Sequence, residues 1–83
     1  MTKVYFTPNT QEILNKLRDK KLEKRILGAK SKLEKNPYEG KKLTGKLEGQ
    51  YSLRIWPYRI VYFINQQKDI IITDIRHRND IYR

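Results

Sequence analysis

The fold is decided by a stretch in the second half of the chain, Tyr51-Ser52-Leu53-Arg54-Ile55-Trp56-Pro57-Tyr58-Arg59-Ile60-Val61-Tyr62-Phe63-Ile64. Apolar and polar residues alternate in it with a period of two, the period at which side chains of a β-strand return to the same face. In this register Leu53, Ile55, Ile60 and Ile64 share a face within their strands. Pro57 interrupts the alternation, so the stretch predicts two strands on either side of the proline.

Two further strands are predicted outside this stretch. Residues 65–69 are polar and predict a turn, after which residues 70–75 are nearly continuous in isoleucine. Such a run is typical of a central strand with both faces partly covered, and we expect the chain to leave the sheet at Arg76. Near the start, Val4, Tyr5 and Phe6 are β-formers followed by Pro8, which predicts a short first strand.

The region between these strands has the spacing of two amphipathic helices. Ile13, Leu14 and Leu17 fall on one helical stripe, and a second stripe recurs at intervals of three and four through Leu22, Ile26, Ala29 and Leu33. Asp19-Lys20 separates the helices and Asn36-Pro37 ends the second, while the glycine- and lysine-rich residues 38–50 predict a loop. The expected fold is therefore α+β in the order β-α-α-β-β-β, one domain over residues 1–83, with the helical hairpin on one face of a small, mostly antiparallel sheet.

Composition narrows the classes of function. The 83 residues carry 19 Lys and Arg against nine Asp and Glu, and a net charge of +10 attracts polyanions such as nucleic acid or an acidic protein. The absence of cysteine excludes disulfides and thiolate metal sites. No stretch approaches the roughly 20 apolar residues that cross a bilayer. We expect a soluble, cytoplasmic protein with no metal site.

The candidate site follows from strand parity. If Leu53 and Ile60 face the helices, Arg54 and Arg59 face away from them, together on an exposed sheet surface. Cleavage of RNA without metal needs cations for the charge on phosphorus and groups that accept and donate protons. Arg54, Arg59 and Arg78 are the candidate cations, and His77 and Tyr82 the candidates for proton transfer or base stacking.

Simpler interpretations remain open for each feature. The arginines could be ordinary charges on the solvated face of an antiparallel sheet, His77 could make local hydrogen bonds, and Tyr82 could dock the chain end. Trp56 and Phe63 could stack on bases, although contact with an apolar partner segment is the commoner use of exposed aromatic rings. The lysine-rich helices are most simply a solvated face, and docking on ribosomal RNA is the functional alternative.

Several motifs together resemble one known family. They are Asn36-Pro37-Tyr38, Lys42-Leu43-Thr44-Gly45-Lys46-Leu47-Glu48-Gly49, Tyr51-Ser52-Leu53-Arg54-Ile55, Tyr58-Arg59-Ile60-Val61-Tyr62 and Ile75-Arg76-His77-Arg78-Asn79-Asp80-Ile81-Tyr82. In this order and spacing they resemble the RelE/ParE superfamily of bacterial and archaeal toxins, over the whole chain. The strand Tyr-Arg-Ile-Val-Tyr followed by His-Arg-x-Asp-Ile-Tyr is the most specific part of the resemblance.

The resemblance implies the toxin of a type II toxin-antitoxin system. Its RelE branch cleaves mRNA in the ribosomal A site by attack of the 2′-hydroxyl, without cofactor, and inhibits translation. By position, Arg54, Arg59 and Arg78 match basic residues of that branch, and Tyr82 its terminal tyrosine, which stacks on or activates the substrate. His77 falls where some members carry a basic or imidazole group. Ser52 departs from the lysine that RelE-like enzymes often place there, which leaves the general base unassigned.

The resemblance also implies partners, and it leaves two other functions open. The expected partners are an acidic antitoxin in a hetero-oligomer, the ribosome with its A-site mRNA, and 16S ribosomal RNA contacted by the basic helices. A ParE-like toxin would instead poison DNA gyrase through protein contacts and perform no chemistry. An inactive relative kept for partner binding or regulation is the third alternative, and the serine in place of a lysine at position 52 is the reason to retain it.

Overall fold

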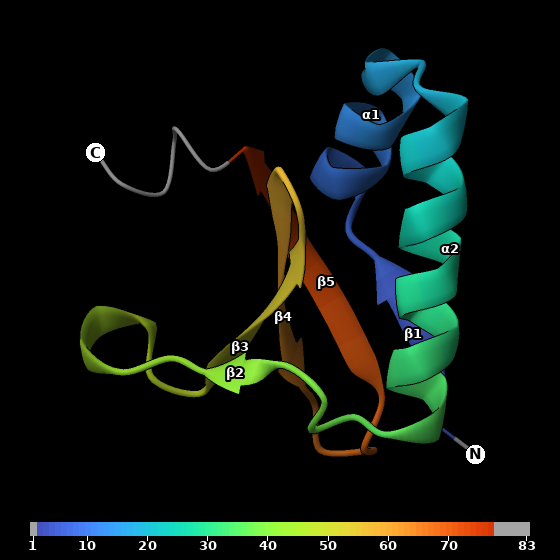
Figure 1. The fold of residues 1–83 in the computed structure, drawn as a ribbon. Helices are drawn as coiled ribbons and strands as arrows, with labels where there is room; N and C mark the ends of the chain where they lie inside the picture. Colours follow the sequence, from blue (N-terminus) through green and yellow to red (C-terminus); the bar gives the residue numbers. More distant parts are fainter. Residues whose placement is uncertain (1, 78–83) are drawn as a thin grey trace.

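Two helices cover one face of a five-stranded sheet in the computed structural model of the protein (Figure 1), which describes residues 2–77 apart from the side chain of Leu47. The strands are β1 (Val4–Phe6), β2 (Lys41–Lys42), β3 (Gln50–Ile55), β4 (Tyr58–Ile64) and β5 (Ile70–His77), and the helices are α1 (Pro8–Leu17) and α2 (Lys20–Lys35), with a 3₁₀ turn at Gly45–Leu47. The predicted α+β class, and the helical hairpin on one sheet face, are confirmed.

Polar caps fix where the helices begin and end. The Thr7 hydroxyl accepts a hydrogen bond from the backbone N–H of Thr10 at 3.2 Å and starts α1. The Asp19 carboxylate accepts from the backbone N–H groups of Lys21 and Leu22, so the predicted break between the helices is the N-cap of α2. Asn36, which precedes a proline, ends α2.

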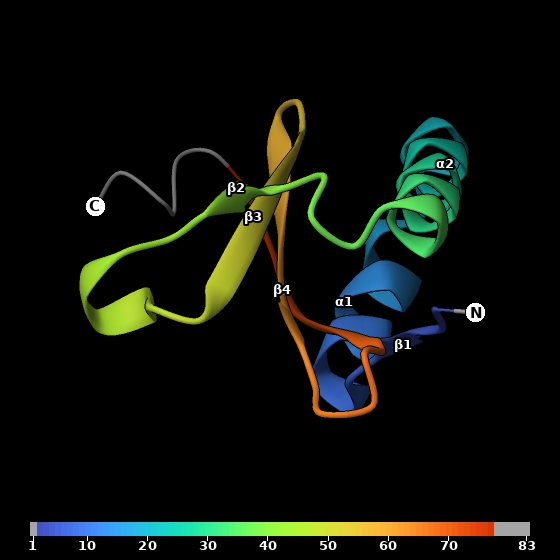
Figure 2. The same ribbon diagram turned by 90° about the horizontal axis from the view of Figure 1, so that it is seen from below.

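The strand order is β1-β5-β4-β3-β2, with β1 parallel to β5 and the other neighbours antiparallel. Seen from below, both helices lie on the same side of the sheet (Figure 2). The core lies between these layers, and its buried members are Val4, Leu22, Ile26, Ala29, Leu33, Ile55, Ile60, Tyr62, Ile70, Ile72 and Ile75. Among the described residues, neither α1 nor α2 lies over the opposite face of β3, β4 and β5, which we call the open face.

The structure differs from the predicted order at two places, and both lie beside the open face. Part of the predicted loop over residues 38–50 forms β2, whose two residues pair with Tyr51 and Ser52 of β3. The expected exit from the sheet at Arg76 is wrong, because β5 continues through Arg76 and His77, which pair with Arg59 and Tyr58. The third and fourth predicted strands are otherwise where the sequence placed them.

A bulge interrupts the regular alternation of β5. Val61 pairs with Asp74 whereas the next residue of β4, Tyr62, pairs with Ile72, so Thr73 is an extra residue in β5. The Thr73 hydroxyl donates a hydrogen bond to the backbone carbonyl of Val61 at 3.3 Å. The bulge allows Ile72 and Ile75 to be buried together although they are three residues apart, and it reverses the facing of residues 74–77.

Candidate functional site

Three arginines lie side by side across the open face. Arg54 of β3 pairs directly with Arg59 of β4, and Arg59 pairs directly with Arg76 of β5. Residues directly opposite each other on antiparallel strands share a face, with Cβ atoms about 5 Å apart. We call Arg54, Arg59 and Arg76 the arginine row. The structure thus brings two of the sequence-predicted site residues together and adds a third that the sequence analysis missed.

We expect the arginine row to lower the stability of the fold. Like charges at directly opposed positions of a sheet repel one another, and replacing such a pair by neutral β-formers stabilises a sheet. An anion bound between the side chains would remove this cost, and a phosphate can accept two parallel hydrogen bonds from each planar guanidinium group. The row therefore has the composition and the placement of a phosphate-binding site.

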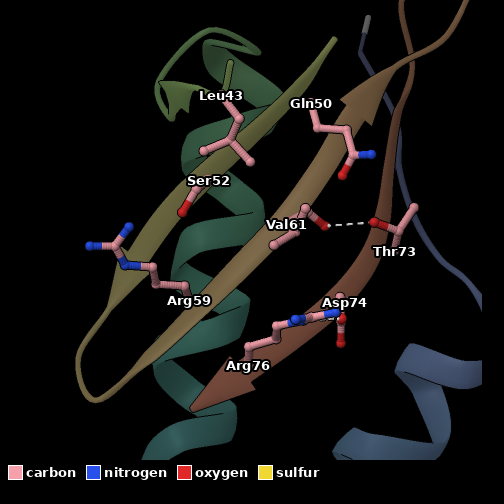
Figure 3. Close-up of a pocket in the computed structure, with 8 residues that line it drawn as sticks. All are labelled: Leu43, Gln50, Ser52, Arg59, Val61, Thr73, Asp74 and Arg76. Carbon is pink, nitrogen blue, oxygen red and sulfur yellow. Dashed lines mark hydrogen bonds and ion pairs between the residues drawn. The ribbon is translucent and has the colours of Figure 1, made fainter. Parts of the chain in front are cut away.

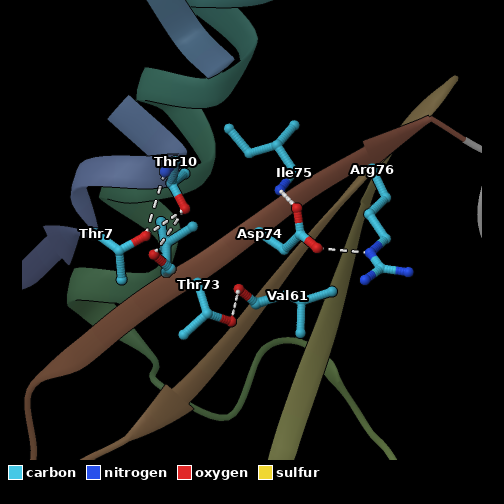
Figure 4. A network of polar contacts seen from close by, with 8 residues as sticks. Thr7, Thr10, Val61, Thr73, Asp74, Ile75 and Arg76 are labelled. Carbon is cyan, nitrogen blue, oxygen red and sulfur yellow. Dashed lines mark hydrogen bonds and ion pairs between the residues drawn. The ribbon is translucent and has the colours of Figure 1, made fainter. Parts of the chain in front are cut away.

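One member of the row has an acidic partner. The Nε atom of Arg76 lies 2.6 Å from a carboxylate oxygen of Asp74, whose other oxygen accepts a hydrogen bond from the backbone N–H of Ile75 (Figure 4). Both residues stand on the strand directly beyond the bulge. Because Asp74 engages the Nε edge of the guanidinium, the pair fixes the orientation of Arg76 beside Arg59, and its half-exposed position keeps the energetic gain small.

The row borders a hollow of about 370 Å³ on the open face. Its lining residues come from β3, β4, β5 and the segment after β2, and Figure 3 shows their side chains turned to the side of the sheet away from α2. They are Leu43, Gln50, Ser52, Arg59, Val61, Thr73, Asp74 and Arg76. The walls thus combine apolar contacts from Leu43 and Val61 with cations at one end, an arrangement that suits a nucleotide held by its phosphate.

A smaller hollow continues from the first toward the sheet edge. Its lining includes Arg54 and Arg59 together with Lys41 of the edge strand and the carboxylate residue Glu39. Ser52, which is almost fully buried, lines both hollows. The two hollows therefore meet at Ser52 and Arg59, in the middle of the open face.

His77 does not join the arginine row. It pairs with Tyr58, and the two rings pack edge to face with their centroids 5.2 Å apart. Since the bulge makes Ile75 and His77 face the helix side, the imidazole lies across the sheet from Arg76. Without the bulge, the parity set by Ile70 and Ile72 would have turned His77 to the open face and Arg76 toward the helices. Because of the bulge, Arg76 lies on the open face and His77 lies on the helix side.

The other two predicted site residues, Arg78 and Tyr82, lie outside the described residues. Within residues 2–77, no group of three or more acidic or imidazole side chains is arranged to hold a metal ion. Over the same range no helix is long and apolar enough to cross a membrane.

The exposed large hydrophobic residues Tyr5, Leu27, Tyr38 and Trp56 are not among the lining residues of the two hollows. Trp56 in the turn between β3 and β4 is 51% exposed, and the backbone carbonyl of this residue accepts a hydrogen bond from the guanidinium of Arg25 on α2. Leu27 on α2 and Tyr5 on the edge strand β1 are also exposed. These residues suit contacts with a protein partner on the helix side and at the rim of the sheet.

Comparisons with known proteins agree with this architecture. The family model described as "ParE toxin of type II toxin-antitoxin system, parDE" matches residues 4–82. A solved chain of the toxin-antitoxin complex RelBE2 from Mycobacterium tuberculosis superposes with a TM-score of 0.79 and 30% identity, covering 93% of this chain and 91% of that one. A chain of the RelB-RelE antitoxin-toxin complex from Methanococcus jannaschii gives a TM-score of 0.74 and 25% identity, covering 94% of both.

Comparison with curated protein sequences gave no match. The family model spans nearly the whole chain, and the solved structures share its layers over more than nine tenths of its length. The predicted superfamily is thereby confirmed. The chain belongs to the ParE toxin family of type II toxin-antitoxin systems, within the RelE/ParE superfamily.

Proposed function

We propose that this toxin is a ribosome-dependent endoribonuclease that cleaves mRNA in the A site without metal and so inhibits translation. The observation that carries the proposal is the arginine row, with its paired residues on three adjacent strands beside an open hollow. Three guanidinium groups at such spacing suit a phosphodiester, whose negative charge increases as the reaction proceeds.

The proposed reaction needs no second substrate besides RNA. The 2′-oxygen forms a bond to the adjacent phosphorus as its proton passes to a base, and the bond from phosphorus to the 5′-oxygen breaks as that oxygen receives a proton. The products are a 2′,3′-cyclic phosphate and a 5′-hydroxyl. Arg59, at the centre of the row, would stabilise the charge on the phosphorane with Arg54 and Arg76 on either side. Tyr82 stays the predicted group for proton transfer or stacking.

The partners follow from charge and from the relatives. The two solved relatives reported above are named as toxin-antitoxin complexes, and a chain with a net charge of +10 suits an acidic antitoxin that covers its cationic surface. The exposed residues Leu27, Trp56 and Tyr5 would supply apolar contacts to that antitoxin. The lysine-rich outer side of α2 would contact ribosomal RNA.

Gyrase poisoning is the second candidate function, because the matching family model is described by ParE. A toxin that acts only by contact with gyrase requires no arginine row beside a hollow, and the two solved relatives reported above come from RelBE2 and RelB-RelE complexes. These observations favour the nuclease.

Cell-free translation with primer extension tests the proposal. The parent protein should produce cuts within the A-site codon, and Arg59→Ala should lower the cleavage rate by about 10²-fold or more, the usual scale for losing a transition-state charge stabiliser. Lys68→Asn is the matched control. It removes one positive charge from the turn at the far end of β4, where the left-handed backbone (φ 68°) also accepts asparagine.

Two results would contradict the nuclease. Intact mRNA together with inhibition of DNA supercoiling by purified gyrase would assign the toxin to the gyrase-poisoning class. Equal cleavage by the parent and Arg59→Ala would separate the activity from the arginine row.

A further inference from the structure

A lysine from the edge of the sheet lies next to the arginine row. Lys41 of β2 pairs directly with Ser52 of β3, so both side chains stand on the open face, whereas Lys42 pairs with Tyr51 and faces the other way. Lys41 lines the smaller hollow with Arg54 and Arg59. The register thus gives two adjacent lysines, both exposed and of the same charge, of which one faces the row.

The backbone that carries Lys41 is held firmly to the core. The N–H of Gly40 donates to the Tyr62 hydroxyl at 2.9 Å, and that hydroxyl donates to the backbone carbonyl of Pro37, also at 2.9 Å. A Cβ atom on Gly40 would lie 2.6 Å from the Tyr62 hydroxyl and 2.9 Å from the carbonyl oxygen of Ser52. Only glycine allows this approach, so the residue before Lys41 is fixed against β3 and β4.

We propose that Lys41 is a fourth cation of the site and contacts the phosphodiester of the RNA substrate. The inference rests on the proposed nuclease function and adds a residue to its site. A lysine side chain spans about the distance between neighbouring strands, so its ammonium can meet a phosphate held by Arg54 and Arg59 over Ser52. It would stabilise the charge on phosphorus while the bond to the 2′-oxygen forms and the bond to the 5′-oxygen breaks, and it would transfer no proton itself.

The competing explanation is that Lys41 only protects a sheet edge. Lysines on short edge strands prevent pairing with other chains, and they do so on either face. Edge protection gives Lys41 and Lys42 equal importance, whereas a site role concerns Lys41 alone. Lys42 is therefore the matched control for Lys41.

The test compares Lys41→Gln with Lys42→Gln in single-turnover cleavage of A-site mRNA, with thermal unfolding followed for both. Lys41→Gln should lower the cleavage rate about 10- to 100-fold, and Lys42→Gln should cleave like the parent. Lys41→Arg should keep most of the activity, because it keeps the positive charge. Both glutamine variants should unfold at the parent temperature, since both side chains are exposed.

Three results would overturn the inference. Equal cleavage rates for the two glutamine variants would make Lys41 an edge residue and leave the nuclease proposal standing. Normal cleavage by Lys41→Gln with weakened capture of the antitoxin would assign the lysine to the partner. A parent protein that cuts no mRNA would end the nuclease proposal and this inference with it.

Discussion

The two faces of the sheet are expected to have opposite effects on stability. Under the helices, Ile60, Tyr62 and Ile72 are fully buried and contribute the free energy of folding. On the other side of the same strands, Arg54, Arg59 and Arg76 stand in direct opposition, an arrangement that costs stability. Because neighbouring residues of one strand point to opposite faces, single substitutions can separate the contribution of the core to stability from that of the charged open face.

The largest expected effect is on the helix side. Ile60→Ala removes a fully buried side chain from the centre of the core, and we expect the free energy of unfolding to fall by about 2–5 kcal/mol. Urea denaturation followed by circular dichroism measures it. Since Ile60 is the neighbour of Arg59 in β4, a variant that kept its stability would show that the two faces are not divided as described.

The helix-side face could be predicted from the sequence because burial imposes a period on it. The stripe from Leu22 to Leu33 and the alternation in β3 and β4 gave the helices, the strands and the face on which they meet. The two-residue strand β2 could not be predicted, because Lys41 and Lys42 carry no apolar pattern and pair only through their backbone with β3. Such an edge is decided by tertiary contacts, not by local preference.

An intermediate effect is expected where the two faces are connected, at the hydroxyl of Tyr62. Tyr62→Phe leaves the backbone carbonyl of Pro37 and the N–H of Gly40 without this partner, which we expect to lower the free energy of unfolding by about 1–3 kcal/mol. Denaturation of the parent and the variant at neutral pH gives the difference. An equally stable variant would mean that the segment before Lys41 is not anchored through this hydroxyl.

The same hydroxyl predicts a dependence of stability on pH. Burial raises the pKa of Tyr62 above its ordinary value of 10.0, while the hydrogen bond from Gly40 opposes the shift. The folded state therefore keeps this proton to a higher pH than the unfolded state, so the stabilisation is complete below the unfolded pKa and is lost as pH rises through the folded pKa. Above about pH 10 the parent should lose stability faster than Tyr62→Phe, which has no proton to lose. Parallel pH profiles would contradict this.

The open face was only partly predictable, and the reason is the bulge. Parity within β3 and β4 correctly placed Arg54 and Arg59 together, because no irregularity lies between them. In β5 the extra residue Thr73 shifts the parity, so that Arg76 joins the row and His77 packs on Tyr58 instead. The sequence signal for the bulge is the spacing of Ile72 and Ile75. They are three residues apart, and a regular strand cannot bury residues at an odd interval on one face, yet both are buried.

The smallest expected effect is on the open face and has the opposite sign. Arg54→Thr replaces one member of the arginine row by a neutral β-former, and we expect the free energy of unfolding to rise by about 0.2–1 kcal/mol at low salt. Because exposed charges are screened by salt, the gain should shrink in about 1 M sodium chloride, where the Debye length is about 3 Å. Urea denaturation at both salt concentrations measures it, with Lys68→Asn as the control for net charge. If Arg54→Thr were less stable than the parent at both salt concentrations, Arg54 would stabilise the sheet. The open face would then contribute to folding at the residue where we expect it to lower stability.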